Sequence, residues 1–481
     1  MIQKVDAFNI KPTIQANPNR YEQLIADNKE LPLQFREQLT QASRLTRLQS
    51  KQTDLHKQVI WDTGANVIAP VLFGFVNWCL AEAQKKGIKR LYFVARDGQI
   101  LNKIAQVICR NWGYDIDCRY FYGSRQAWHA PALQEIGEAE LQWILDGTTF
   151  LSVNSVCERV NIKPEQIKEV LIRCGFAESE WNTNLNKEER NQLRQVFVEK
   201  QVVDLILATA ATYREKAIAY FRQEQLDDGL PFAIVDIGWV GRAQRSFSSL
   251  LISAGIYPEK GVQGFYFALE KKRKALESDN LSAFYNIDKP SREHISHYRH
   301  VFELFVTADH GGTMGYEQQD NQYVPVLRYP KNQAAIDWGL YLLQDAVVEF
   351  AEQFTTNINR DDFSPELFVP VADILIESFI YHPSPLEAKV FGSFLNADDQ
   401  GEKVLYELAP AYNLVSCLKL LLFGKQPFKG IWFPASLARS NFIYQLILSS
   451  SLLKFTHHTR VFIGRFKHLM RVSKPQSIQT S

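Results

Sequence analysis

One short apolar run ends in a charged, glycine-containing turn and then gives way to a helical pattern. The run at 91–95 is rich in aromatic residues and stops at Arg96-Asp97-Gly98, after which apolar residues recur at helical spacing over 99–109. A short apolar run bounded by a turn predicts a buried strand, and the change of period predicts a helix after it. The segment is therefore predicted to be a strand–turn–helix unit.

A second unit of the same kind lies later in the chain. The apolar run 232–235 ends at Asp236, Gly238 and Gly241 follow, and a helical pattern covers 243–252. Two such units place both turns at the carboxyl edge of one parallel sheet, which is where open α/β sheets bind ligands. The chain is therefore predicted to have an α/β fold with a parallel sheet at its core.

The second turn has the features of an anion site. Gly238 and Gly241 allow the backbone to turn sharply and to approach a ligand closely, and the helix after them offers unpaired N–H groups at the positive end of its dipole. Phosphate is the expected ligand. An ordinary buried turn in which Asp236 caps the helix gives the same pattern, so this segment alone leaves both interpretations open.

Further apolar runs extend the predicted sheet. The segments 119–122 and 261–269 are predicted to be strands, and 316–327 has a hairpin-like pattern. Directly after the first of these strands come Ser124 and Arg125. Either they join the same ligand site, or they form a surface turn with a solvated arginine.

Helical periodicity dominates the rest of the chain. It predicts an N-terminal helical segment at 1–57, an α/β core at 58–330 with a helical insertion at 134–228, a helical acceptor-binding or packing region at 331–407, and a basic tail at 408–481. The segment 59–86 is predicted to be a long buried helix because its centre is apolar nearly all round, and 191–224 is predicted to be another long helix.

The charges of the 481-residue chain sum to +1 but are unevenly distributed. Glu407 is the last acidic residue, and among charged residues the rest of the chain has only Lys and Arg. In this tail, 414–423 is apolar, 431–433 is aromatic, and basic residues alternate with Leu, Phe, Val and Ile within 451–471. Apolar and aromatic residues combined with basic ones and no acids are typical of a helix lying on an anionic membrane surface. The alternative is a basic face packed on the protein's own acidic surface. Balanced charge elsewhere argues against nucleic-acid binding.

The cysteines and the start of the sequence indicate the compartment. None of the six cysteines has Cys-x-x-Cys spacing, and the first residues are polar and mixed rather than a signal peptide. No window approaches about 18 uninterrupted apolar residues, so a spanning helix is not expected. We therefore expect a cytoplasmic protein that is peripheral on the inner face of the cytoplasmic membrane.

Histidines recur before the predicted hairpin. His294, His297 and His300 are three residues apart, which on a helix spreads them over an arc of about 120°. A three-histidine zinc site needs tighter convergence, so we expect these side chains to line a polar face.

Taken in order, these motifs resemble a domain found in bacterial polysaccharide gene clusters. The motifs, all within 58–330, are Tyr92-Phe-Val-Ala-Arg-Asp-Gly98, Ser124-Arg125, Val235-Asp-Ile-Gly-Trp-Val-Gly241 with Gln244, and Glu303 followed by the loop His310-Gly311-Gly312. That domain is often fused behind a phosphatase of the HAD type, so such chains are commonly labelled HAD-like hydrolases. This chain lacks the Asp-x-Asp-x-Thr/Val nucleophile motif of those phosphatases. The hydrolase label would therefore belong to the fusion partner.

The domain itself resembles a phosphoribosyltransferase. The resemblance implies a phosphoribosyltransferase-like parallel sheet with large helical insertions. It also implies a glycosyltransferase of O-antigen, capsule or other polysaccharide biosynthesis that moves 5-phosphoribosyl from phosphoribosyl pyrophosphate (PRPP) to a glycan acceptor and releases pyrophosphate. The acceptor would be a lipid-linked glycan of the lipopolysaccharide kind. A separate phosphatase would remove the 5-phosphate, and Mg²⁺ is the expected cofactor.

The same resemblance implies roles for individual residues. Asp236, Asp97 and Glu303 are the catalytic candidates, and Asp236 and Asp97 the candidate Mg²⁺ ligands. The expected substrate contacts are Arg96, Gly98, Ser124, Arg125, Gly238, Trp239, Gly241, Arg242, Gln244, His310, Gly311 and Gly312. Arg96-Asp97-Gly98 would bind pyrophosphate and 236–244 the 5-phosphate. The usual acidic pair after the strand is reduced to Asp236 here, which leaves Asp97 or Glu303 to contribute.

Two other functions remain compatible with the sequence. A glycosyltransferase that uses a nucleotide sugar would share the phosphate-binding turns and the membrane tail. A non-catalytic subunit of a polysaccharide assembly complex would use the glycine turns only for structure. The loop at 310–312 likewise either closes over a ligand or simply leads into the hairpin.

Overall fold

The structure is a computed structural model of the chain, and it describes residues 17–146, 150–287, 292, 297–397, 405–423 and 432–448. The chain divides into two compact units, Met1–Phe379 with Leu395–Tyr406 and Ile380–Phe394 with Glu407–Ser481. The first unit contains the whole sheet.

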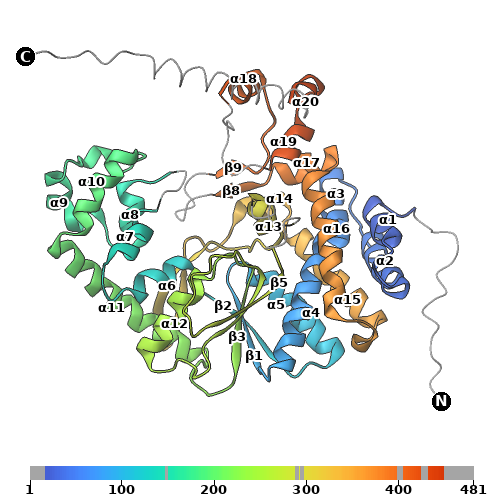
Figure 1. Cartoon of the computed structure of the whole chain (residues 1–481), viewed down its shortest axis with the longest axis horizontal. Helices are drawn as coiled ribbons and strands as arrows, with labels where there is room; N and C mark the ends of the chain where they lie inside the picture. The colour runs from blue at the N-terminus through green and yellow to red at the C-terminus, as the bar shows by residue number, and fades with distance from the viewer. Residues whose placement is uncertain are drawn as a thin grey trace, which may run out of the picture. The chain divides into compact units, whose positions relative to one another are not determined.

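A five-stranded sheet forms the centre of the first unit (Figure 1). In chain order its strands are β1 (Arg90–Val94), β2 (Asp117–Phe121), β3 (Phe232–Asp236), β4 (Gln263–Ala268) and β5 (Asn280–Tyr285). Their order in space is β2-β1-β3-β4-β5, and every neighbouring pair is parallel. The prediction of an α/β fold with a parallel sheet is confirmed.

The connections reverse direction between β1 and β3. From β1 the chain passes through α5 (Gly98–Trp112) to β2 on one side, and it later returns to β3 on the other side of β1. Open α/β sheets bind ligands at the carboxyl ends of the two strands where such a reversal occurs. β1 and β3 pair as far as Phe93↔Val235, so the two predicted turns follow strands that lie side by side.

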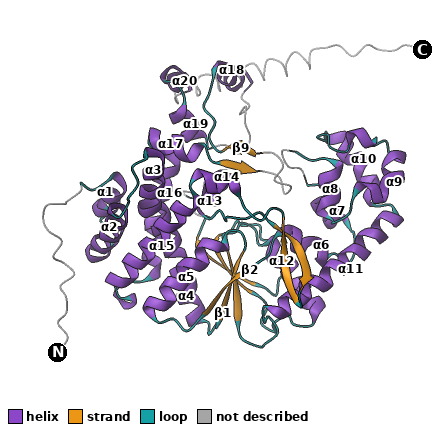
Figure 2. Cartoon of the chain, turned by 180° about the vertical axis from the view of Figure 1, so that it is seen from behind, coloured by secondary structure: helices purple, strands orange, loops and turns teal. Residues whose placement is uncertain are grey.

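Helices cover both faces of the sheet (Figures 1 and 2). On one face, Phe265 and Phe267 of β4 contact the aromatic rings of Trp78 and Phe75 in α4 (Ala69–Lys85). Successive side chains of a strand point to opposite faces, so the residues between these positions lie on the other face of the sheet.

The second face packs against α6 (Arg125–Ala132), α11 (Lys200–Gln223) and α12 (Arg242–Ala254). The strand residues in this cluster are Tyr92, Val94, Phe121, Phe232 and Ile234. The helices contribute several aromatic side chains, among them Trp128, Tyr220, Phe221 and Phe247. This packing places the first residues of α6 and α12 at the carboxyl edge of the sheet.

The hydrophobic pattern does not predict β5. It follows β4 in parallel although the connection, residues 269–279, contains no helix. β5 is an edge strand whose first four residues are exposed or half-buried, and polar Asn280 and Ser282 interrupt its apolar run. An edge strand is paired on one side only, and its sequence needs no continuous apolar stretch.

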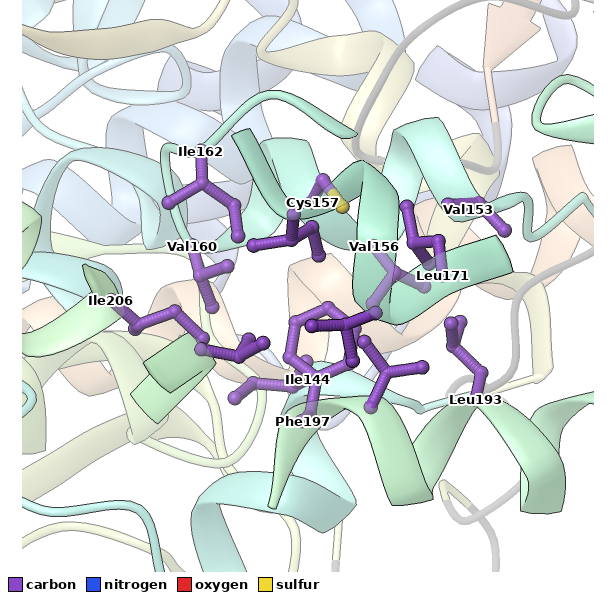
Figure 3. Packing of buried hydrophobic residues seen from close by; sticks show 14 of the residues in the cluster. Ile144, Val153, Val156, Cys157, Val160, Ile162, Leu171, Leu193, Phe197 and Ile206 are labelled. Carbon is purple, nitrogen blue, oxygen red and sulfur yellow. The ribbon is translucent and has the colours of Figure 1, made fainter. Parts of the chain in front are cut away.

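The segment between β2 and β3 is helical, as predicted, and has its own hydrophobic core (Figure 3). Its helices, besides α6 and α11, are α7 (Glu138–Ile144), α8 (Val153–Arg159), α9 (Lys168–Arg173) and α10 (Lys187–Phe197). The single helix expected at 191–224 is wrong, because Glu199 is extended and separates α10 from α11. Phe197 of α10 and Ile206 of α11 are both buried in this core.

The predicted long buried helix runs from Leu55 to Lys85 as α3 (Leu55–Thr63), a π-helical turn η1 (Gly64–Ile68) and α4. It is the one helix of the described residues long and apolar enough to cross a membrane, but 89% of its apolar window is buried inside the protein. That burial is typical of a core helix. Before it, α1 (Arg20–Asp27) and α2 (Leu33–Leu48) form the predicted N-terminal helical segment.

The remaining elements of the first unit follow β5. They are α13 (Arg299–Phe305), the antiparallel hairpin β6 (Thr313–Gln319) and β7 (Gln322–Leu327), α14 (Gln333–Trp338), α15 (Leu340–Asn357) and most of α16 (Phe368–Tyr381). The hairpin-like pattern at 316–327 is thus confirmed. The second unit includes α17 (Pro385–Gly392), α18 (Leu414–Phe423), α19 (Phe433–Arg439) and α20 (Phe442–Leu448). The basic alternation predicted at 451–471 lies outside the described residues.

Candidate functional site

The turn after β1 is short and tightly held. The Ala95 amide donates to the Phe121 carbonyl of β2 at 2.9 Å, and the Gln99 amide donates to the Arg96 carbonyl at 3.0 Å. A Cβ at Gly98 would lie 2.4 Å from the Phe93 carbonyl carbon, so glycine is needed for α5 to begin this close to β1. Asp97 occupies the N-cap of α5 without a capping hydrogen bond from its side chain. Its carboxyl group is therefore not used to start the helix.

The turn after β3 is held by the connection that follows β4. Three of its carbonyls, those of Ile237, Trp239 and Val240, accept hydrogen bonds from the amides of Ala268, Glu270 and Lys274. Gly238 has a φ of +137° and Gly241 a φ of +72°, a region of backbone conformation that favours glycine. These glycines are required by the turn itself. No side chain caps α12, so the positive end of its dipole is left for another anion.

Asp97 and Asp236 bring two carboxyl groups to this edge. Partial burial raises the pKa of Asp97 well above its ordinary range, and the nearby charge of Asp236 raises it further. Burial also raises the pKa of Asp236 to about 6, although the amides of Gly238 and Ile237 donate hydrogen bonds to its carboxyl group. Two like charges held together resist joint ionisation. The pair therefore favours a shared proton or a bound cation.

Glu303 is the third carboxyl group, and its electrostatics differ. Partial burial acts to raise its pKa, but a hydrogen bond from His300, the charge of that imidazole and the charges of Arg299 and Arg125 lower it overall. The His300 Nδ1 atom lies 3.1 Å from the Glu303 Oε2 atom. Glu303 is therefore the most readily ionised of the three.

Four arginines surround these carboxyl groups. Loss of hydration lowers the pKa of the Arg125 guanidinium, Glu303 opposes this, and the positive charges of Arg96, Arg242 and Arg299 lower it further. The four guanidinium groups come from separate segments: the turn after β1 and the beginnings of α6, α12 and α13. Three positive charges that weaken the charged form of Arg125 indicate a site suited to a polyanion, which would relieve this repulsion.

Trp239 adds an unused donor to the second turn. Its side chain is 8% exposed, and its Nε1 atom has no hydrogen-bond partner among the described residues. The indole packs edge-on against Phe302 at 6.2 Å between ring centroids, and Phe302 stacks on Phe267 of β4 at 4.1 Å. These aromatic contacts hold α13 over the end of the sheet and so position Glu303.

Two of the predicted substrate contacts serve the protein's own structure. Gln244 has no exposed surface; its Nε2 atom donates to the Val262 carbonyl at 3.0 Å, and its Oε1 atom accepts from the Tyr266 hydroxyl at 2.7 Å. Ser124 caps α6, accepting from the Ala127 amide at 3.0 Å, and its hydroxyl donates to the Thr313 carbonyl. Of the interpretations left open by the sequence, the structure favours a structural role for Ser124.

The loop at 310–312 is tied to the hairpin. The Gly311 amide donates to the Tyr329 carbonyl at 3.0 Å, and the Gly312 carbonyl accepts from the Arg328 amide at 2.9 Å. His310 is buried, with Nδ1 2.8 Å from the Gly311 carbonyl and Nε2 2.7 Å from the Tyr120 hydroxyl. Because a carbonyl only accepts, Nδ1 carries the hydrogen. These bonds favour a loop that leads into the hairpin over one that closes on a ligand.

Sequence reasoning missed Arg299 and did not predict the contact between His300 and Glu303. Arg299 and Glu303 are four residues apart in α13, a spacing that places both on one face of a helix, so the signal was present. His300 was expected only to line a polar face, yet it bonds Glu303. His297 is exposed, and His294 lies outside the described residues. Within the described part of the chain, no group of three or more His, Cys, Asp or Glu side chains could hold a metal.

The predicted site residues thus separate into two sets. The structure gathers Arg96, Asp97, Arg125, Asp236, Trp239, Arg242 and Glu303 around the carboxyl ends of β1 and β3, and it gives Ser124, Gln244 and the loop at 310–312 partners within the fold. The geometry and charge of the first set carry the functional argument alone, because no protein-family model matches the chain and no curated protein matches it.

Proposed function

We propose that the chain is a glycosyltransferase that transfers 5-phosphoribosyl from PRPP to a hydroxyl group of a glycan acceptor and releases pyrophosphate. The observation that carries the proposal is the gathering of four arginines and three carboxyl groups where the sheet connections reverse. PRPP has a diphosphate at one end and a phosphate at the other. Such a donor needs two separate anion sites with a cation site between them, and the two adjacent turns offer this arrangement.

Each turn is assigned one end of the donor. The diphosphate would bind at the turn after β1, where Arg96 and Arg125 supply guanidinium groups suited to phosphate oxygens. The 5-phosphate would bind at the start of α12, where the helix dipole and Arg242 favour an anion. The Trp239 Nε1 atom is a further donor at this end. Arg242 also lies 3.7 Å from the Asp146 carboxylate, so the 5-phosphate would share this guanidinium with Asp146.

Asp97 and Asp236 fit the Mg²⁺ ion that a PRPP-dependent reaction implies. Mg²⁺ prefers oxygen ligands and is commonly held by one or two carboxylates together with substrate phosphates. Burial and, after it, the charge of Asp236 raise the pKa of Asp97, and a cation would relieve the repulsion between the two carboxylates. When bound, the ion would neutralise charge on the diphosphate. Two protein carboxylates suffice in that case, in keeping with the lack of a larger ligand group among the described residues.

In the reaction, the bond from the anomeric carbon to the diphosphate oxygen breaks, and a bond from that carbon to the acceptor oxygen forms. Arg96 and Arg125 would stabilise the negative charge on the departing oxygen. Glu303, with its lowered pKa, is suited to offset the positive charge that develops on the ribose ring and is a poor proton acceptor. The acceptor's proton would pass to an oxygen of Asp97 or Asp236 that Mg²⁺ does not occupy.

Calorimetry and product analysis test the proposal. The full chain should bind PRPP in the presence of Mg²⁺, and Arg125→Gln should weaken this binding at least about 10-fold because a guanidinium–phosphate contact is lost. Arg245→Gln is the matched control, since Arg245 is exposed on α12 and does not affect the charges of the site. With a lipid-linked glycan acceptor, the chain should release pyrophosphate.

Other outcomes would overturn it. Release of a nucleoside diphosphate from a nucleotide sugar, without pyrophosphate release from PRPP, would assign the chain to the other class of glycosyltransferase. Failure to bind any phosphorylated donor with Mg²⁺ would favour a non-catalytic assembly subunit. Release of phosphate without any acceptor would indicate a hydrolase. A phosphoribosyl product would require a separate phosphatase to lose its 5-phosphate.

A further inference from the structure

The second unit exposes apolar side chains on two neighbouring helices. On α18, Leu414, Val415 and Leu418 are 58%, 60% and 45% exposed, and on α20, Phe442 and Ile443 are 73% and 62% exposed. α18 and α20 lie beside each other in both views (Figures 1 and 2). These five side chains, the α18/α20 apolar patch, form a larger apolar group than scattered surface residues usually do.

The patch is not exposed because its helices lack a core. Cys417 of α18 and Leu448 of α20 are buried together with Tyr412, and residues of α19 pack against this small cluster. The unit is also pinned by polar contacts: the Trp432 Nε1 atom donates to the Ile380 carbonyl at 2.6 Å. The inward faces of the two helices are therefore satisfied, and the outward apolar faces remain.

The charge around the patch is positive. After Glu407 the chain has ten Lys and Arg residues and no Asp or Glu. Glu407 itself is paired with Arg439 at 3.0 Å, so it neutralises no other residue of the unit. Lys419 is exposed on α18 directly beside Leu418. Exposed apolar groups with cations and without acidic residues match the interface of an anionic bilayer.

We infer that the second unit is a membrane-docking surface on which the α18/α20 apolar patch enters the headgroup region of an anionic lipid bilayer. A second copy of this chain fits less well, because it would bring the same positive charge to the same face. The inference is independent of the donor chemistry. It locates the insertion on α18 and α20, within the predicted basic tail at 408–481.

Vesicle sedimentation with the full chain tests the inference. Vesicles of phosphatidylcholine with about a third phosphatidylglycerol should bind the chain. The double variant Phe442→Ser, Ile443→Ser should bind at least about 10-fold more weakly, because it removes two apolar side chains that would be buried in the bilayer. Both positions are highly exposed, so the fold should be kept, which circular dichroism would verify. Leu33→Ser, at a 61% exposed position on α2, is the matched control and should not change binding.

Vesicles with and without anionic lipid separate the contribution of the positive charge from that of the apolar side chains. Lys419→Gln should weaken binding to the anionic vesicles and leave the weaker binding to pure phosphatidylcholine unchanged. Equal binding of the Phe442, Ile443 variant and the unaltered chain would overturn the inference, as would failure of the unaltered chain to bind vesicles. Association of the chain with itself through this patch, abolished by the same variant, would assign the surface to a second copy instead. Donor binding measured by calorimetry should be the same for all these variants.

Discussion

The helical insertion and the carboxyl edge of the sheet differ in how their charged side chains are stabilised. In the insertion the core is apolar, and the buried Arg159 guanidinium donates to the Ile144 and Asp146 carbonyls at 2.9 and 2.8 Å. At the edge, the charges of Asp236 and Glu303 add to the effect of burial in raising the pKa of Asp97, and arginines lower the pKa of Arg125. The insertion is arranged for stability. The edge gathers like charges whose repulsion a bound polyanion and a bound cation would relieve.

The largest expected effect is that of Asp236→Asn on transfer. The variant should lose roughly 10³-fold in kcat/KM for PRPP, because a carboxylate proposed to hold Mg²⁺ and to accept the acceptor's proton is removed. The asparagine keeps an oxygen that can accept from the Gly238 amide, so the turn should persist. Pyrophosphate release measured at saturating acceptor checks this.

A matched variant shows whether that loss is specific to the edge. Asp115 is a surface carboxylate, 96% exposed, whose partner is Lys89. Asp115→Asn should leave transfer unchanged. Full activity of Asp236→Asn would place the chemistry elsewhere and would leave the edge with only a structural role.

The insertion should show the reverse behaviour. Phe197 is fully buried in the insertion core, and Phe197→Ala should lower the free energy of unfolding by about 3 kcal/mol or more, because it removes buried area and leaves a cavity. Urea unfolding measures this loss. Calorimetry with PRPP and Mg²⁺ at a temperature where the variant is folded should give unchanged affinity, since no residue of the charged site belongs to this core. A large loss of affinity would show that the two regions are coupled.

The pH dependence of stability sharpens the contrast further. Burial raises the pKa of Asp236 from 3.8 to about 6, so between these values the folded chain binds more protons than the unfolded chain, and stability falls as pH rises. Below about pH 3 the carboxyl is protonated in both states and costs nothing. Above about pH 7 the cost is complete, on the order of 2–3 kcal/mol. Asp236→Asn should therefore be more stable than the unaltered chain at pH 7.5.

The same comparison made at about pH 3, below both pKa values, is the control for that prediction. There the difference in the free energy of unfolding between Asp236→Asn and the unaltered chain should nearly vanish. A variant that is less stable at pH 7.5 would show that the ionised carboxylate supports the fold, in conflict with its raised pKa.

The two turns of the site could be predicted from the sequence because they depend on local signals. An apolar strand, an aspartate and a glycine before a helix placed Asp97 and Asp236 correctly at the carboxyl edge. The partners of Gln244 could not be predicted, because Val262 and Tyr266 are brought to it only by the packing of α12 on β4. β5 was missed for a related reason, since pairing with β4 makes it a strand and its own pattern does not. Tertiary contacts therefore decide which residues of the motif face the site.

The smallest expected effect is that of replacing Ser124. The sequence motif assigns Ser124 to the ligand site, whereas its hydrogen bonds within the fold indicate a structural role. Its hydroxyl caps α6 at the Ala127 amide and donates to the Thr313 carbonyl, so Ser124→Ala should lower the free energy of unfolding by about 1 kcal/mol. Thermal unfolding would show a modest decrease in Tm. Affinity for PRPP should stay within about 2-fold, because the hydroxyl hydrogen already has an acceptor. A 10-fold loss of affinity at unchanged stability would instead make Ser124 a ligand contact, and would extend the charged edge from β1 and β3 to the end of β2.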